Sequence, residues 1–171
     1  MYVKQARMMA GYNQWMNEKL YKVCSQLTDE ERKRERGAFF NSIHGTLNHI
    51  ILGDKIWMGR FRNIPFKVAS LDEELFSDFE ELHGERVVMD REITAWTGEL
   101  TDNDLETTLE YTSFVNPARR CYPMWIAVTH FFNHQTHHRG QLTTLLSQCN
   151  VDYGVTDLIW LPEAQPEYNV M

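Results

Sequence analysis

The feature of this 171-residue sequence that most restricts its fold is a helical period that recurs in four long segments. The period is clearest between residues 70 and 100, where the seam positions follow at alternating spacings of four and three: Leu75, Phe79, Leu82, Arg86, Met89, Ile93, Trp96 and Leu100. This spacing puts one row of side chains on a single helix face, as in the seam of a helical bundle. Ser70 and Glu73 have the spacing of a capping box, which predicts that this helix begins near Ser70.

Three other segments predict helices over residues 3–27, 42–61 and 123–148. The second is apolar around most of its circumference apart from a strip formed by His44, Asn48 and Lys55, which is typical of a helix enclosed by neighbours. Between residues 102 and 121 the stretch LETTLEYTSF alternates like a short strand or hairpin, and Asn116-Pro117 suits a turn. We therefore predict one all-α domain over residues 1–171, a four-helix bundle with a short hairpin or irregular connection before the last helix.

Composition and charge argue against several functional classes. The net charge of −7 is unsuited to a broad nucleic-acid interface, which needs a basic surface. Apolar runs fall short of the roughly 20 residues that cross a membrane, and the first residues do not resemble a secretory signal. The three cysteines form no C-x-x-C pair, which favours free thiols in a reducing cytoplasm. We expect a cytoplasmic protein without nucleic-acid or membrane partners.

The segment THFFNHQTHHRGQ, residues 129–141, holds four of the seven histidines. The expected interior seam of this helix is the series Met124, Ala127, Phe131, His134, His138, Gln141 and Leu145. His134 and His138 thus occupy consecutive core layers, while His130 lies at the edge of the seam and His137 is expected to face solvent. Each buried imidazole nitrogen needs a partner, which a divalent metal or a neighbouring polar group would supply.

His49 on the second helix is the candidate for a third ligand. Gly45 and Gly53 lie one turn on either side of it, and glycine inside a helix is destabilising unless something approaches closely. The alternative is close packing of two helices. His44 falls on the polar strip, and His83 is expected at the surface or rim. His49, His134 and His138 together would suit Zn²⁺, Ni²⁺ or Fe²⁺, and three protein ligands leave a position open for water or substrate.

Three segments resemble the DinB/YfiT-like family: YNQWMNEKLY, GTLNHIILGDKIWMGRF and HFFNHQTHHRGQL, with the closing DYGVTDLIW. The resemblance covers nearly the whole chain and implies an up-down-down-up four-helix bundle that is often dimeric. It also implies one divalent metal ion held by three histidines, which match His49, His134 and His138. Characterised relatives include transferases that use low-molecular-weight thiols and an isomerase, and others are expected to be metal-dependent hydrolases.

Three more side chains are candidates for roles near the metal or the substrate. Arg86 would extend to solvent, pair with Asp54 or Asp90, or clamp an anionic substrate. His130 would shuttle a proton or lie at the rim, and Gln141 would orient a ligand. Arg139 is expected on the outward face, in an ion pair or an interface.

Three functions remain open from the sequence. The first is a metal-dependent thiol S-transferase or hydrolase that acts on a small molecule with an open three-histidine site. The second is a non-catalytic stress or interaction protein with a structural metal, and the third is a metal-free bundle. The apolar DLIWL near the end of the chain is expected to pack back on the domain or against a partner, which favours a homodimer.

Overall fold

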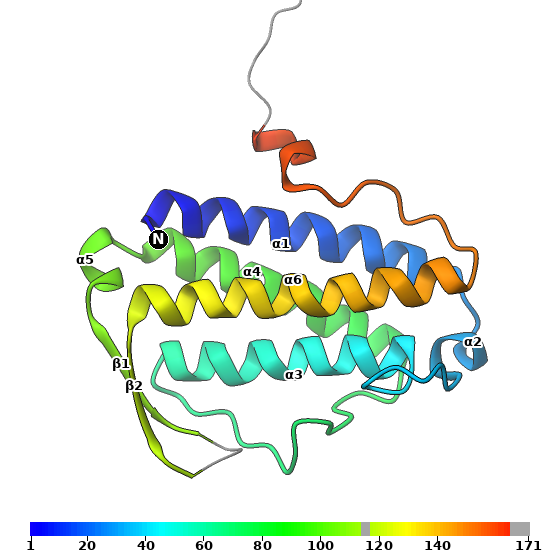
Figure 1. Cartoon of the computed structure of the whole chain (residues 1–171), viewed down its shortest axis with the longest axis horizontal. Helices are drawn as coiled ribbons and strands as arrows, with labels where there is room; N and C mark the ends of the chain where they lie inside the picture. The colour runs from blue at the N-terminus through cyan, green and yellow to red at the C-terminus, as the bar shows by residue number, and fades with distance from the viewer. Residues whose placement is uncertain (114–116, 165–171) are drawn as a thin grey trace, which may run out of the picture.

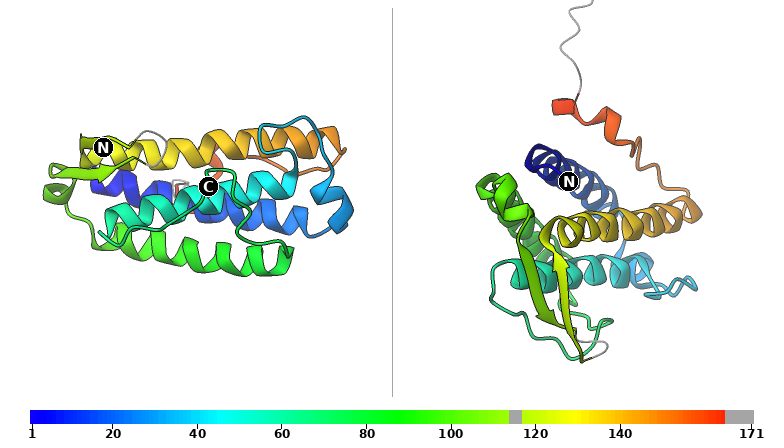
Figure 2. Two further views of the ribbon diagram at one scale, coloured as in Figure 1. Left: turned by 90° about the horizontal axis from the view of Figure 1, so that it is seen from below. Right: turned by 60° about the vertical axis from the view of Figure 1, so that its left-hand side comes forward.

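The computed structural model describes residues 1–113 and 117–164, and four long helices form its body (Figure 1). Their bounds are Val3–Cys24 for α1, Ile43–Phe61 for α3, Phe79–Glu99 for α4 and Met124–Gln148 for α6. The helices run side by side (Figure 2), and the apolar core lies between them. The all-α bundle predicted from the helical period is confirmed.

Contacts between the helices establish their relative directions. The contacting pairs are Arg7 with Thr97 and Asn17 with Asp90 for α1 and α4, Phe61 with Trp96 and Asp54 with Arg86 for α3 and α4, Trp57 with His130 and His49 with His138 for α3 and α6, and Asn13 with Arg139 for α1 and α6. Residue numbers run in opposite senses across α1–α4 and α3–α6, and in the same sense across α3–α4. The order is therefore up-down-down-up, and α4 lies parallel to the helix that precedes it.

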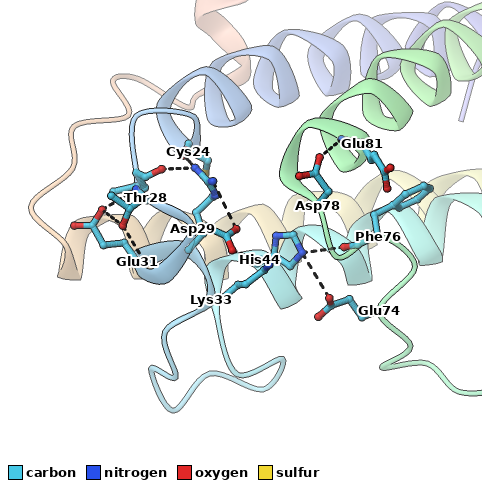
Figure 3. A network of polar contacts seen from close by, with 12 residues as sticks. Cys24, Thr28, Asp29, Glu31, Lys33, His44, Glu74, Phe76, Asp78 and Glu81 are labelled. Carbon is cyan, nitrogen blue, oxygen red and sulfur yellow. Dashed lines mark hydrogen bonds and ion pairs between the residues drawn. The ribbon is translucent and has the colours of Figure 1, made fainter.

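A long crossover, residues 62–78, connects these two parallel helices. The helix predicted from Ser70 is wrong at its start, because α4 begins at Phe79 with the Asp78 side chain accepting from the Glu81 N–H (Figure 3). Glu73 instead accepts from the Ala69 N–H at 2.6 Å. The backbone groups of Leu71 and Phe76 in the crossover bind side chains of α3.

The strip of α3 predicted to be polar is the surface that holds this crossover. His44 and Asn48 are 1% and 2% exposed. The His44 ring contacts the Phe76 carbonyl (Figure 3), with Nε2 2.9 Å from the oxygen, and Asn48 Oδ1 accepts from the Phe76 N–H at 3.0 Å. These groups satisfy each other away from water, which explains polar side chains on an otherwise apolar helix.

The connection between α1 and α3 contains one turn of helix. α1 ends at Cys24, three residues before the predicted Leu27, and Asp29–Lys33 forms α2. Thr28 caps α2, and its hydroxyl and backbone N–H pair with Glu31 in a capping box (Figure 3).

The predicted hairpin precedes α6. After the short helix α5, Asp102–Leu105, strand β1 at Thr108–Thr112 pairs antiparallel with β2 at Arg119–Pro123. Leu109 on β1 is 6% exposed and packs into the apolar core. Asn116 of the predicted turn lies outside the described residues.

The segment after α6 runs back along α1 (Figure 1). The Tyr12 hydroxyl donates to the Thr156 carbonyl at 2.5 Å. Two 3₁₀ turns follow, η1 at Leu158–Trp160 and η2 at Pro162–Ala164. Leu161 is 2% exposed whereas Trp160 is 53% exposed, so the apolar DLIWL packs back on the bundle with only part of its surface. Within the described residues, no helix has the length and apolarity needed to cross a membrane.

The interior of the bundle also holds a polar network around Arg86, which is 1% exposed. Its Nη1 donates to Asp54 Oδ2 at 2.5 Å, and its Nη2 lies 3.0 Å from Asp90 Oδ1. Gln135 Nε2 donates to Asp54 Oδ1 at 2.8 Å. Of the roles considered for Arg86, pairing with the two aspartates is the one that the structure shows.

Arg139 does not face outward as predicted, since its side chain is only 3% exposed. It donates through Nη1 to Asn13 Oδ1 and through Nη2 to Thr136 Oγ1, and it lies 5.4 Å from the centre of the Tyr12 ring. Burial lowers the pKa of the guanidinium to about 10, so Arg139 remains charged at neutral pH. The prediction failed because a spacing of 3.5 residues drifts around an α-helix with 3.6 residues per turn.

Candidate metal centre

Three histidines from two helices converge on one point. His49 comes from α3 and His134 and His138 from α6, and one ring nitrogen of each lies within 4.8 Å of the others. The two α6 rings share a face because they are four residues apart. The ring centroids are 4.5 Å apart for His49 and His138, 5.3 Å for His49 and His134, and 4.4 Å for His134 and His138. The structure thus brings together the three histidines named as candidate ligands.

The two glycines that flank His49 permit two close approaches. A Cβ at Gly53 would lie 2.8 Å from Cε1 of His134, so the absence of a side chain there lets the His134 ring reach α3. A Cβ at Gly45 would lie 2.2 Å from the Phe40 carbonyl oxygen, which leaves room for the loop before α3. The close approach predicted from the glycines is confirmed, and it comes from a ring and a loop rather than from a bare helix–helix contact.

Hydrogen bonds fix the orientation of two of the three rings. His49 Nδ1 lies 2.9 Å from the Leu71 carbonyl oxygen, and His138 Nδ1 lies 2.8 Å from Gln141 Oε1. Because both partners are acceptors, each Nδ1 carries the proton and each Nε2 keeps its lone pair. The Nε2 atoms of His134 and His138 are 3.1 Å apart, so the lone pair of His138 faces the neighbouring ring. A cation, or a proton held by His134, satisfies this arrangement.

Burial keeps the cluster in its neutral form. His49 and His138 are 7% and 8% exposed, and His134 is partly buried. Burial is the main cause that lowers the pKa of His49 to about 4 and that of His134 to about 3, and it also lowers the pKa of His138. Neutral imidazole is the form that coordinates metals, so these rings are ready to bind at neutral pH without losing a proton.

The lowered pKa values predict that the chelator-treated protein loses stability as the pH falls from 6.5 to 4. In this range an unfolded histidine binds a proton while His49 and His134 stay neutral, so the unfolded state takes up more protons. Their stabilisation is complete above pH 6.5 and declines by at most about 1.4 kcal/mol per pH unit for each ring. Urea unfolding across this range measures the slope. The same slope in His134→Gln would contradict the assignment, and His137→Gln is the matched control.

Other candidate residues lie around the cluster rather than in it. His130 is exposed, with its ring centroid 6.0 Å from that of His134 and 4.9 Å from that of Trp57. Gln141 orients His138, as described above, and also lies 3.3 Å from the exposed His137. Among the described contacts none joins Arg86 to the three histidines.

No sequence pattern indicated that Phe40 and Leu71 contact the histidine cluster. The Phe40 ring stacks on His49 with centroids 3.7 Å apart and meets His138 edge-on at 5.5 Å. Asn41, with φ of 64°, turns the chain into α3 directly after this ring. Neither residue belongs to a helical period. The glycine at position 45 was the one sequence signal that pointed to the loop carrying Phe40.

The sequence pattern described as the DinB family matches residues 1–169 of the chain. The chain belongs to the DinB family. A curated member, Protein DinB from Bacillus subtilis (strain 168), is 26% identical over 162 residues, which cover 85% of this chain and 87% of that protein. The resemblance to the DinB/YfiT-like family that was inferred from the sequence is thus confirmed.

A solved DinB-like structure has the same fold. The crystal structure of a DinB-like protein from Bacillus cereus ATCC 10987 aligns with a TM-score of 0.57 at 24% identity. The alignment covers 82% of this chain and 89% of the other. This likeness supports the bundle architecture of the DinB family in the present chain.

Proposed function

We propose that His49, His134 and His138 bind one divalent transition-metal ion, and that the protein is a metal-dependent enzyme of the thiol S-transferase or hydrolase type. The observation that carries the proposal is the convergence of three imidazole nitrogens on one point, with the Nδ1 protons of His49 and His138 held elsewhere. Neutral nitrogen donors suit Zn²⁺, Ni²⁺ or Fe²⁺ better than Mg²⁺ or Ca²⁺.

A divalent ion bound by three protein ligands supplies a Lewis acid that makes a coordinated water or thiol nucleophilic near neutral pH. The residues around the cluster support that chemistry. The Leu71 carbonyl and the Gln141 amide hold two rings in place, and Phe40 covers one face of His49. His130, beside His134 and accessible to solvent, is positioned to exchange protons with a bound substrate.

Metal analysis and an activity screen test this proposal together. Protein purified without a histidine tag should contain close to one equivalent of metal per chain. The metal-loaded protein should then accelerate either the attack of a small thiol on an electrophile or the hydrolysis of a model ester or amide, and His138→Ala should not. A bound metal with a filled coordination sphere and no activity would favour a structural metal. A metal-free protein that gains none on reconstitution would refute the site.

Gly53→Ala is predicted to weaken metal binding about tenfold or more while leaving the fold intact. The new methyl group displaces the His134 ring, which lies 2.8 Å from its position, and a displaced ligand weakens coordination. Alanine favours the helix by about 1 kcal/mol, which offsets the movement of one ring. Metal titration against a chromogenic chelator measures the affinity. Gly84→Ala on α4, with nothing within 4 Å, is the control and should leave the affinity unchanged.

A further inference from the structure

A cavity of about 750 Å³ lies between the end of α3, the crossover and the hairpin. Arg60 from α3, Phe66 and Lys67 from the crossover, and Tyr111 from β1 are among its lining residues. Its size matches that of a pocket for a small organic molecule. None of these residues belongs to the histidine cluster.

A second, smaller cavity of about 260 Å³ lies beside this region, against α6. It shares Tyr111 with the larger cavity, and Trp57 and His130 also line it. The His130 ring, which lines the smaller cavity, lies 6.0 Å from the ring of His134, although His49, His134 and His138 do not themselves line it. Tyr111 thus borders both cavities, and His130 lies between the smaller one and the three histidines.

Arg60 is the cationic group of the larger cavity that contacts its aromatic side chains. Its guanidinium carbon lies 4.5 Å from the Trp57 ring centre and 4.0 Å from that of Tyr111. Through residues 1–113 and 117–164, no carboxylate, carbonyl or hydroxyl accepts a hydrogen bond from the Arg60 guanidinium. The Arg60 side chain is only partly buried and its nitrogen atoms remain accessible, so the guanidinium is free to bind an anionic ligand.

The charges around the cavity favour an anion. Glu110 is a carboxylate in the lining, and its side chain pairs with Arg119 on the opposite strand. Lys67 adds a second positive charge to the same wall. Burial lowers the pKa of Arg60, and the neighbouring Tyr111 opposes this shift.

We propose that Arg60 binds the carboxylate of a small organic acid whose apolar body lies against Trp57 and Tyr111, on the side of His130. The planar guanidinium matches a carboxylate in a bidentate geometry, and the two rings hold the guanidinium in one plane. The assignment of this acid as the substrate rests on the proposed function, whereas its binding to the cavity does not. An apolar acid suits the site better than a bare anion because aromatic side chains line both cavities.

The alternative is that Arg60 is purely structural and only joins α3 to the hairpin through the Trp57 and Tyr111 rings. In that case the protein would bind an acid and the neutral amide of the same shape with equal affinity. Calorimetric titration with phenylacetate, 4-phenylbutyrate and their two amides therefore separates the two roles. We expect the acids to bind about tenfold or more tightly than the amides.

Arg60→Gln should abolish this discrimination while the amides bind as before. Arg62→Gln, on the same helix end, is the matched control, because Arg62 pairs with Glu92 at the surface and should leave the discrimination unchanged. An acid-to-amide ratio near one in the unmodified protein, or a ratio unchanged in Arg60→Gln, would overturn the proposal. The ratio in the unmodified protein decides the matter even if Arg60→Gln fails to fold.

The titrations are run on the protein as purified and again after chelation. Arg60 is not among the proposed metal ligands, so the discrimination should persist without metal. Discrimination that disappears on chelation would show that the carboxylate binds the metal and would refute a role for Arg60. A protein that binds no metal yet discriminates through Arg60 would refute the metal proposal alone.

Discussion

Asp54→Ala is expected to lower the free energy of unfolding by about 3 kcal/mol, because it removes one of the two carboxylates that pair with the buried Arg86 and leaves the Gln135 amide without its partner. Asp54 is 0% exposed and accepts hydrogen bonds from both residues. The loss lies at the lower end for broken buried pairs, since Asp90 still faces Arg86. In a chain of this length the melting temperature should fall by roughly 6–12 °C.

Two variants control the Asp54 prediction. Glu92→Ala breaks the surface pair with Arg62, whose atoms are 3.8 Å apart, and should change stability by less than about 1 kcal/mol. The triple variant Asp54→Leu, Arg86→Met and Asp90→Asn removes all three buried charges and should recover much of the loss, because an amide oxygen at position 90 still accepts from Asn13 and Asn17. A loss in Asp54→Ala no larger than that in Glu92→Ala would contradict the role of the network.

Zinc added to the chelator-treated protein is expected to raise its melting temperature by roughly 5–10 °C. A ligand that binds only the folded state, free at 100 times its Kd, stabilises by about 2.7 kcal/mol, which corresponds to this shift in a chain of this length. His49→Ala, His134→Ala and His138→Ala should each lose most of the rise, since each removes one converging nitrogen. Differential scanning calorimetry with and without zinc makes the comparison.

His137→Ala is the control for the zinc experiment. His137 adjoins His138 in the sequence but is exposed, so its removal should leave the zinc-dependent rise intact. If His137→Ala lost the rise as completely as His138→Ala, zinc would be binding at the surface and the buried cluster would not be the site.

Periodicity predicted the parts of this molecule that depend on one helix face meeting another. The spacing on α6 placed His134 and His138 together, and the glycines beside His49 indicated that a group approaches α3 there. The observed interior face of α6 also includes Gln135 and Arg139, so the histidines lie at one edge of that face, beside α3. A strict heptad misses this rotation because the helix has 3.6 residues per turn.

The remaining features depend on contacts between segments that have no common period. Ser70 and Glu73 have the spacing of a helix start, but the Leu71 and Phe76 carbonyls bind side chains of α3. Tertiary hydrogen bonds thus outweighed a local capping preference. The position of Arg60 between two aromatic rings could not be predicted either, because those rings come from α3 and from a hairpin about 50 positions later.

The up-down-down-up order has a consequence for how the molecule is assembled. His49 and its two counterparts lie half a chain apart, and α6 is the last long helix to leave the ribosome. A nascent chain carries only His49 of the three cluster histidines until that helix docks on α3, because contacts distant in sequence form late. The proposed metal centre can therefore form only after α6 has been made, and a truncated polypeptide that ends before α6 would lack two of its three ligands.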